Sequence, residues 1–174
     1  MNIRHTPARR GALRSVLGLG AVLGLGAVAT ASPAAAAGKP SARSTGSPRY
    51  LAAEFVRRFN AHDLDGIVAL HDPAYFAHDN GADGDLASLE ATLGGFFAGV
   101  PDARIEVINA VFDGDLYTVN FVTSGTNTGP LYGQPATGKS LRFSEIRVRR
   151  AAHGRIAEEW GLLDAGTLQA QLAG

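Results

Sequence analysis

Asp164 has the sequence context that best fits a residue transferring protons. It ends a run at residues 156–164 that a strand would organise, with Trp160, Leu162 and Asp164 on one face, because side chains alternate across a strand. If that face lines an apolar interior, loss of water raises the pKa of the carboxyl and makes it a better general base. The alternative is structural: Asp164 precedes a helix-compatible segment, and aspartate is a preferred N-cap.

His78 is the second candidate catalytic residue. It follows Tyr75 and Phe76 at the end of a short extended segment. A neutral imidazole in a pocket could polarise a carbonyl group or relay a proton. The alternative is a loop histidine that is hydrogen-bonded to Asp79 or Asn80.

One acidic and four aromatic side chains are the candidate substrate-binding residues. Glu145 lies two residues after Phe143, and the two therefore share a face of a strand. Either this face lines a cavity, or Glu145 and Arg147 face water; alternation alone leaves both readings open. The aromatic side chains are predicted to wall a cavity, although each would also serve as plain core: Trp160, Phe121, Phe143 and Phe76.

Several common kinds of catalytic site are excluded by what the sequence lacks. The 174 residues include no cysteine, which rules out thiolate metal sites, disulfides and thiol nucleophiles. His-Asp pairs occur, but neighbouring side chains point in different directions and no HExxH spacing is present. Neither a GxxxxGK[ST] phosphate loop nor a GxSxG elbow is found. We therefore expect neither a metal nor a cofactor.

The elements that would position these residues follow from hydrophobic periodicity. Apolar residues recur at helical spacing early in the chain, and the period changes to two after Pro101. Ser47 and Pro48 form an N-cap and first helical position. Helices followed by antiparallel strands indicate an α+β fold. The expected helices are residues 48–60, 63–70, 85–98 and 165–172, and the expected extended segments are residues 74–78, 104–112, 116–125, 140–150 and 155–164.

The N-terminal segment resembles a signal for export. Four arginines precede a weakly apolar stretch at residues 16–29 and a run of small residues that ends at Ala37. The stretch is shorter than the ~20 apolar residues of a membrane-spanning helix, although an N-terminal anchor is the alternative. Arg9-Arg10 favours twin-arginine export, with the general secretory route equally open. The expected organisation is a signal peptide at residues 1–37, a flexible leader at 38–47 and one domain at 48–174, secreted or on the cell-envelope exterior.

Export also changes the net charge of the chain. Removal of the four arginines in the signal leaves 12 basic groups against 16 acidic ones. An acidic protein is a poor partner for nucleic acid or an anionic membrane, because both are bound mainly through Lys/Arg contacts to phosphate. A small hydrophobic molecule is the expected partner, and no membrane span is expected after processing.

Several collinear blocks resemble the SnoaL-like polyketide cyclase (ester cyclase) family. They are FVRRFN with DLDG after it, YFAHD, VPD, GTNTGPLYG, PATGK with RFS, and GRIAEEWGLLD, and together they extend over residues 48–174. Two positions depart from the family pattern. Ala136 stands where a second proline is common, and Glu159 stands where a histidine is common.

The resemblance implies a fold and an activity. The fold is the cone of nuclear transport factor 2, with N-terminal helices packed on a curved, mostly antiparallel sheet. The activity is cofactor-independent acid/base chemistry, aldol-type cyclisation or isomerisation, on a small hydrophobic carbonyl compound. The aspartate at position 164 moves a proton next to the carbonyl, and His78 resembles a pocket histidine. Homodimers are common for this architecture, and the sequence does not decide the oligomeric state. Two readings compete with the enzyme: a secreted, non-catalytic carrier or sensor, and a dimer whose open sheet face is only an interaction surface.

Overall fold

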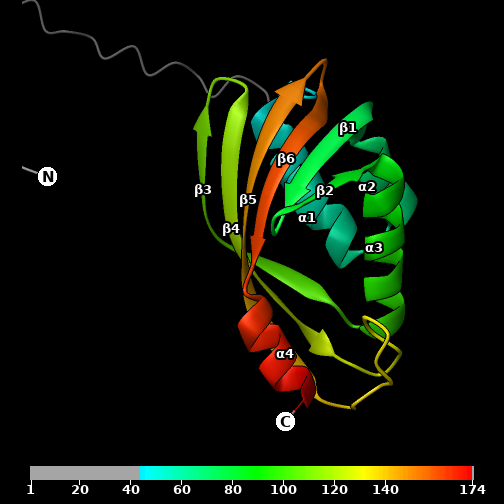
Figure 1. Ribbon diagram of the computed structural model, residues 1–174. Coiled ribbons are helices and arrows are strands. Elements are labelled where there is room, and N and C mark those ends of the chain that lie inside the picture. Colours follow the sequence, from blue (N-terminus) through cyan, green and yellow to red (C-terminus); the bar gives the residue numbers. More distant parts are fainter. Residues whose placement is uncertain (1–43, 174) are drawn as a thin grey trace, which may run out of the picture. The chain divides into compact units, whose positions relative to one another are not determined.

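Three helices precede the main run of strands, as the periodicity predicts (Figure 1). The computed structural model describes residues 44–173; the predicted signal peptide and residues 38–43 of the leader lie outside this range. The sequence pattern does not predict the short strand β2. The elements in chain order are α1 (Pro48–Asn60), α2 (Leu64–Ala69), β1 (His71–Asp79), β2 (Ala82–Asp85), α3 (Leu86–Gly99), β3 (Arg104–Asp113), β4 (Leu116–Thr126), β5 (Ser140–Ala152), β6 (Arg155–Leu163) and α4 (Ala165–Ala173).

The first helix begins where the sequence predicts. The Ser47 side chain accepts a hydrogen bond from the backbone N–H of Tyr50 at 3.2 Å, and proline follows in the first turn. The apolar stripe Leu51, Phe55 and Phe59 is buried against the sheet. Burial of this stripe fixes which side of α1 faces the interior.

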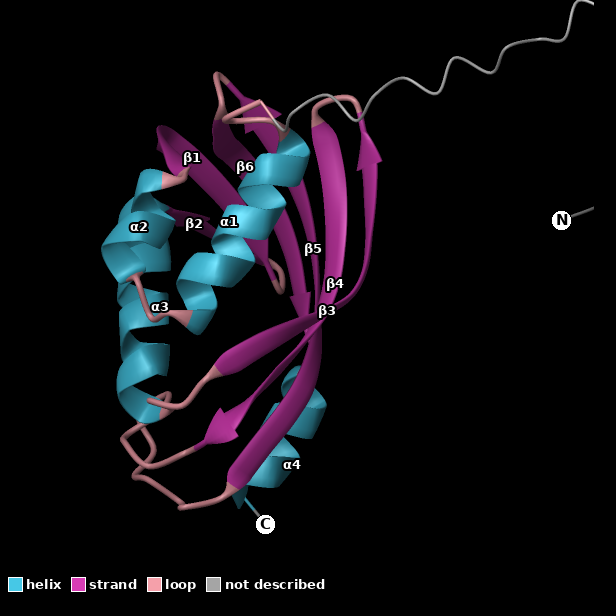
Figure 2. Ribbon diagram, turned by 180° about the vertical axis from the view of Figure 1, so that it is seen from behind, coloured by secondary structure: helices cyan, strands magenta, loops and turns pink. Residues whose placement is uncertain are grey.

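A six-stranded curved sheet carries the helices on one face. The strand order is β2-β1-β6-β5-β4-β3, in which β1 and β6 run parallel and every other pair is antiparallel. Helices α1, α2 and α3 cover the concave face, and α4 lies beside β5 at one end (Figure 2). The predicted α+β class and mostly antiparallel sheet are confirmed.

A β-bulge in β6 decides which residues face the helices. Ala151 of β5 pairs with Ile156, but the preceding Arg150 pairs with Glu158, and Ala157 is therefore an extra residue. One inserted residue exchanges the two faces of a strand, because side chains alternate with a period of two. Ile156 is buried before the bulge, and Glu159 is buried after it.

The two faces of the sheet differ in chemical character. The concave face and the helices enclose the main hydrophobic core, which includes Tyr75, Tyr117 and Ile156. The convex face leaves large apolar side chains exposed, Leu162 to 66% and Ile146 to 44%. Within residues 44–173, no helix is both long and apolar enough to cross a membrane.

Candidate active site

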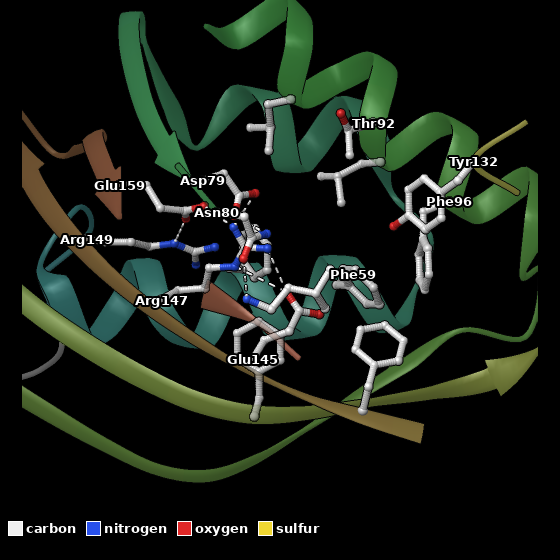
Figure 3. Close-up of a pocket in the computed structure, with 16 residues that line it drawn as sticks. Phe59, Asp79, Asn80, Thr92, Phe96, Tyr132, Glu145, Arg147, Arg149 and Glu159 are labelled. Carbon is white, nitrogen blue, oxygen red and sulfur yellow. Dashed lines mark hydrogen bonds and ion pairs between the residues drawn. The ribbon is translucent and has the colours of Figure 1, made fainter. Parts of the chain in front are cut away.

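An elongated cavity lies between the concave face of the sheet and helices α1 and α3 (Figure 3). Its volume is about 220 Å³. One part is lined by aromatic and aliphatic side chains, and the other by charged ones. The apolar part includes Phe55, Phe59, Phe96, Phe121, Phe143 and Leu163. The charged part consists of Asp79, Glu145, Arg147, Arg149 and Glu159.

The charged side chains meet because a glycine leaves room between two strands. In the sheet register, Arg147 of β5 pairs with Gly161 of β6, and Gly161 pairs with Asp79 of β1. These three residues form one row on the concave face. A Cβ atom at Gly161 would collide with the Arg147 guanidinium and lie 2.6 Å from Oδ1 of Asp79. The missing side chain lets Arg147 reach across β6 to Asp79.

Arg147 is held by three carboxylates. Its Nε and Nη2 donate to Oε2 of Glu145 at 3.2 and 2.7 Å. Its Nη1 donates to Oδ2 of Asp79 at 2.8 Å and to Oε1 of Glu159 at 3.1 Å. A guanidinium has five N–H groups, which leaves one Nη2 hydrogen without an acceptor among the described residues. That hydrogen is free to donate to a ligand.

The Arg149–Glu159 pair is buried behind Arg147. Arg149 donates from Nε to Glu159, and its guanidinium lies 3.8 Å from the ring centre of Phe55. Burial opposes ionisation of Glu159, but the charges of Arg149 and Arg147 outweigh it and hold its pKa at about 2. Glu159 is therefore ionised at neutral pH, where it forms ion pairs with both Arg147 and Arg149.

The charged part of the cavity holds one more carboxylate than guanidinium. Asp79, Glu145 and Glu159 face Arg147 and Arg149. The nearby His71 does not restore the balance, because burial and the Arg149 charge lower its pKa to about 4. The surplus anion gives the cavity a proton acceptor.

Three of the predicted substrate-binding residues line this cavity. Phe121 of β4 and Phe143 of β5 form part of the apolar wall, and Glu145 lies among the charged residues. Glu145 also accepts a hydrogen bond from the Thr123 hydroxyl at 2.7 Å. Alternation left open whether Glu145 and Arg147 face a cavity or water. In the structure, both face the cavity.

Asp164 does not lie in the cavity, and the prediction of a buried carboxyl with a raised pKa is wrong. The side chain is exposed and accepts a hydrogen bond from the backbone N–H of Thr167 at 3.0 Å. Hydrogen bonding by Thr167 lowers the pKa of Asp164. The structural alternative holds: Asp164 caps α4.

His78, Trp160 and Phe76 are also outside the cavity. His78 pairs with Trp160 on the convex face, where their rings stack at 5.4 Å, and Phe76 lies 4.9 Å from His78. The His78 Nδ1 lies 3.1 Å from the carboxylate of Asp83. The predicted role of Trp160 fails because the bulge at Ala157 turns it away from the helices. The roles of His78 and Phe76 fail because they alternate along β1 with Tyr75 and Ala77, which are the buried residues of that strand.

Sequence reasoning did not place four residues in the site: Asp79, Tyr132, Arg149 and Glu159. The charged residues at positions 145, 147 and 149 alternate along β5 with the same period as the buried Leu141 and Phe143, and therefore share their face. This pattern could have indicated that charged side chains face the interior. Asp79 is adjacent to His78 but points to the opposite face. Tyr132 comes from the loop before β5, and its hydroxyl points into the cavity (Figure 3).

No cluster of histidine and acidic side chains suited to a metal ion occurs among the residues that the structure describes. The carboxylates of the cavity each form an ion pair with arginine.

The chain is similar to several solved structures with the same fold. AclR from Streptomyces galilaeus, named as a proposed hydroxylase, has 22% identity and a TM-score of 0.68, with 71% of this chain and 93% of that chain covered. IdmH from Streptomyces antibioticus, named as a proposed polyketide cyclase, has 27% identity and a TM-score of 0.65, with 73% and 99% covered.

A third similar structure is a proposed SnoaL-like polyketide cyclase from Jannaschia, with 16% identity and a TM-score of 0.67. The match covers 78% of this chain and 96% of that chain. Among curated proteins, none matches this chain. The SnoaL-like polyketide cyclase family matches residues 50–172, which include every helix and strand except the first residues of α1 and the end of α4. The chain therefore belongs to the SnoaL-like polyketide cyclase family.

Proposed function

We propose that this protein catalyses a cofactor-independent aldol-type cyclisation or isomerisation of a small, mostly apolar carbonyl compound. The observation that carries the proposal is a cavity with apolar walls and one carboxylate more than it has guanidinium groups. Membership of the SnoaL-like polyketide cyclase family supports the same class of reaction. A surplus carboxylate in such a cavity can accept a proton from carbon, and a guanidinium can stabilise the oxygen that gains charge.

Asp79 is the carboxylate best placed to act as the base. Its side chain is 40% exposed, compared with 11% for Glu145 and 3% for Glu159. One Asp79 oxygen accepts from Arg147, and the other accepts from the Asn80 amide at 3.1 Å. Glu159 is a weak base because its pKa is about 2. The exposed carboxylate is therefore the one that a substrate can reach.

The reaction divides between Asp79 and Arg147. Asp79 takes a proton from the carbon next to the carbonyl, and the electron pair moves onto the carbonyl oxygen. The remaining Nη2 hydrogen of Arg147 donates to that oxygen as its charge develops. The enolate carbon then attacks a second carbonyl and forms a C–C bond, or it is protonated to give the isomer. Protonated Asp79 returns the proton to the product oxygen or carbon.

Deuterium exchange tests the first step without knowledge of the natural substrate. Small aryl ketones are incubated in D₂O, and loss of the proton next to the carbonyl is followed by NMR. We expect the Asp79→Asn variant to lose ~10²–10⁴-fold of the enzyme-dependent exchange rate. Asp164→Asn is the matched control, because Asp164 is exposed and should leave the rate unchanged. Full exchange in Asp79→Asn with loss in Asp164→Asn would reverse the assignment.

A carrier of small apolar molecules is the second candidate function. Each carboxylate of the cavity accepts hydrogen bonds from arginine, and such bonds reduce its ability to accept a proton. Native mass spectrometry of protein purified from its producing cells distinguishes the candidates. An intact ligand bound at one copy per chain supports a carrier, whereas conversion of an added ketone supports an enzyme.

We also propose that the protein acts outside the cytoplasm. The basis is the sequence of residues 1–37, with arginines, an apolar stretch and small residues in that order. N-terminal sequencing of protein from the culture medium and from the cell envelope should find a mature chain that begins near Gly38. A chain that retains Met1 in the cytoplasmic fraction contradicts export.

A further inference from the structure

A second, larger cavity adjoins the candidate active site. Its volume is about 600 Å³, and it lies between α4 and the loop that precedes β5. Leu168 and Leu172 of α4 form one wall, and Pro135 and Ala136 of the loop form another. Among the described residues that line it, none is charged. Gln134, Thr137, Gln169 and Tyr132 contribute polar groups, and the rest of the lining is apolar, which favours a mostly apolar occupant.

Two side chains separate this cavity from the charged one. Tyr132 and Leu163 line both cavities. Leu163 is the last residue of β6, and Tyr132 projects from the loop with its hydroxyl directed into the first cavity (Figure 3). The two cavities are therefore adjacent, and the boundary between them consists of these two side chains.

The loop holds Tyr132 in a defined position. The backbones of Leu131 and Gln134 exchange two hydrogen bonds of 2.9 Å and close a two-residue turn. Tyr132 occupies the left-handed region at φ 50°, a conformation that is unfavourable for a residue with a side chain. Leu131 is buried against Gly99, where an added Cβ would lie 3.1 Å from its Cβ. This buried leucine anchors the turn and keeps Tyr132 between the cavities.

We infer that the substrate spans both cavities, with its carbonyl end near Asp79 and Arg147 and an apolar tail under α4. This inference rests on the proposed function, which places the reactive carbonyl in the charged cavity. Only the Tyr132 and Leu163 side chains stand between the two cavities, so the tail has to pass beside them, and the uncharged walls suit hydrocarbon better than a charged extension. Tyr132 then selects for a ligand that is narrow where it passes between the two spaces.

A series of unbranched methyl ketones tests the inference. Binding of hexan-2-one, octan-2-one and decan-2-one is measured by isothermal titration calorimetry. If the tail enters the second cavity, the affinity should rise about fourfold for each added methylene group across the series. Occupation of the first cavity alone predicts that the affinity stops rising once that cavity is full.

Two alanine-to-tryptophan variants supply the matched comparison. Ala136 lines the second cavity, whereas Ala170 is exposed on α4 and does not line it. Ala136→Trp should weaken decan-2-one binding about tenfold or more and leave hexan-2-one binding unchanged. Ala170→Trp should leave both ligands unchanged. Gln169→Trp, which fills the same cavity from α4, should repeat the Ala136→Trp result, and circular dichroism checks the fold of each variant.

The outcomes separate this inference from the proposed function. Equal affinities for hexan-2-one and decan-2-one, or equal effects of Ala136→Trp and Ala170→Trp, would overturn the tail site. In that case, deuterium exchange that depends on Asp79 would still support the proposed reaction. Absence of binding by every ketone in the wild-type protein would overturn both.

Discussion

Arg147 contacts all three carboxylates in the charged part of the cavity. It can reach them because Gly161 has no side chain to block its path. The guanidinium bonds to carboxylates on three strands, β1, β5 and β6. Burial would lower the pKa of Arg147, but the charges of Glu159, Glu145 and Asp79 outweigh burial and raise it. The group is therefore a permanent cation at every pH at which the protein is folded.

Gly161→Ala should break the contact between Arg147 and Asp79. The new Cβ would occupy space that both side chains use, and overpacking of this kind costs about 1–3 kcal/mol of unfolding free energy. Urea denaturation measures the loss. Gly95→Ala is the control, because a Cβ there meets nothing within 4 Å, and it should gain ~0.5–1 kcal/mol in α3. A Gly161→Ala protein as stable as Gly95→Ala would contradict this account.

Two buried groups should make the fold sensitive to acid in separate pH ranges. The pKa of His71 is about 4 in the folded protein, compared with 6.5 for an unperturbed histidine. The pKa of Glu159 is about 2 in the folded protein, compared with 4.5 for an unperturbed glutamate. Both folded-state values are depressed, so the unfolded chain binds more protons as the pH falls. The stability linked to His71 is lost from about pH 6.5 to 4, and that linked to Glu159 from about pH 4.5 to 2.

Substitution of each group should remove its own part of the pH profile. His71→Gln should flatten the dependence of unfolding free energy on pH between about 6.5 and 4. Glu159→Gln should flatten the dependence below about pH 4.5 and cost ~3–5 kcal/mol at neutral pH, since Arg149 loses its buried partner. Urea denaturation at a series of pH values measures both. Unchanged slopes in both variants would show that other groups control acid unfolding.

At the scale of elements, the sequence predicts where helices and strands lie better than which way they face. The caps at Ser47 and Asp63 and the turn at Gly114 act within a few residues, and the predicted boundaries follow them closely. The bulge at Ala157 depends on pairing with β5 and β1. Local alternation carries no information about that pairing, and the face of Trp160 was therefore predicted wrongly.

The α4 helix supplies a test of the corrected role of Asp164. Asp164→Ala should destabilise α4 by ~1 kcal/mol, because the N–H of Thr167 loses its acceptor. Asp164→Asn should have almost no effect, because asparagine is an equally good N-cap. Hydrogen exchange of the α4 backbone amides measures the difference. Asparagine and alanine variants with equal losses would argue against capping.

At the scale of the whole molecule, the convex face of the sheet exposes apolar side chains that the candidate site does not explain. Ile146 and Leu162 pair directly across β5 and β6, and both are exposed there. Phe76, whose side chain is 42% exposed, lies on the same face, where its ring contacts His78 and the His78 ring stacks on Trp160. Apolar side chains gathered on one face are typical of a surface that binds another protein.

A second copy of the chain is the occupant that we propose for this face, and a charge placed on the face should prevent such assembly. Leu162→Glu would bury two carboxylates at a two-fold interface and should shift the sedimenting species from two copies to one. Ala87→Glu on α3 is the control, since it adds the same charge to an exposed position away from this face. A wild-type protein that sediments as one copy at high concentration contradicts the homodimer.

The sequence by itself determined the order of elements, the α+β class and the family. These properties depend on local periodicity, caps, turns and collinear motifs, which a single chain displays directly. Alternation along β4 and β5 also placed Phe143 and Glu145 on one face, but it left open whether that face lines the cavity, and the structure decided this.

Only the tertiary structure decided which carboxylate faces the cavity. An extra residue at Ala157 exchanges the faces of β6, and the absent side chain of Gly161 lets Arg147 meet Asp79 across it. The bulge arises in the pairing of β6 with its hairpin partner β5, whereas the contact between Arg147 and Asp79 joins residues that are 68 positions apart in the chain. A one-residue change in pairing moves every later side chain of β6 to the other face, and Asp79 rather than Asp164 is among the carboxylates that line the cavity.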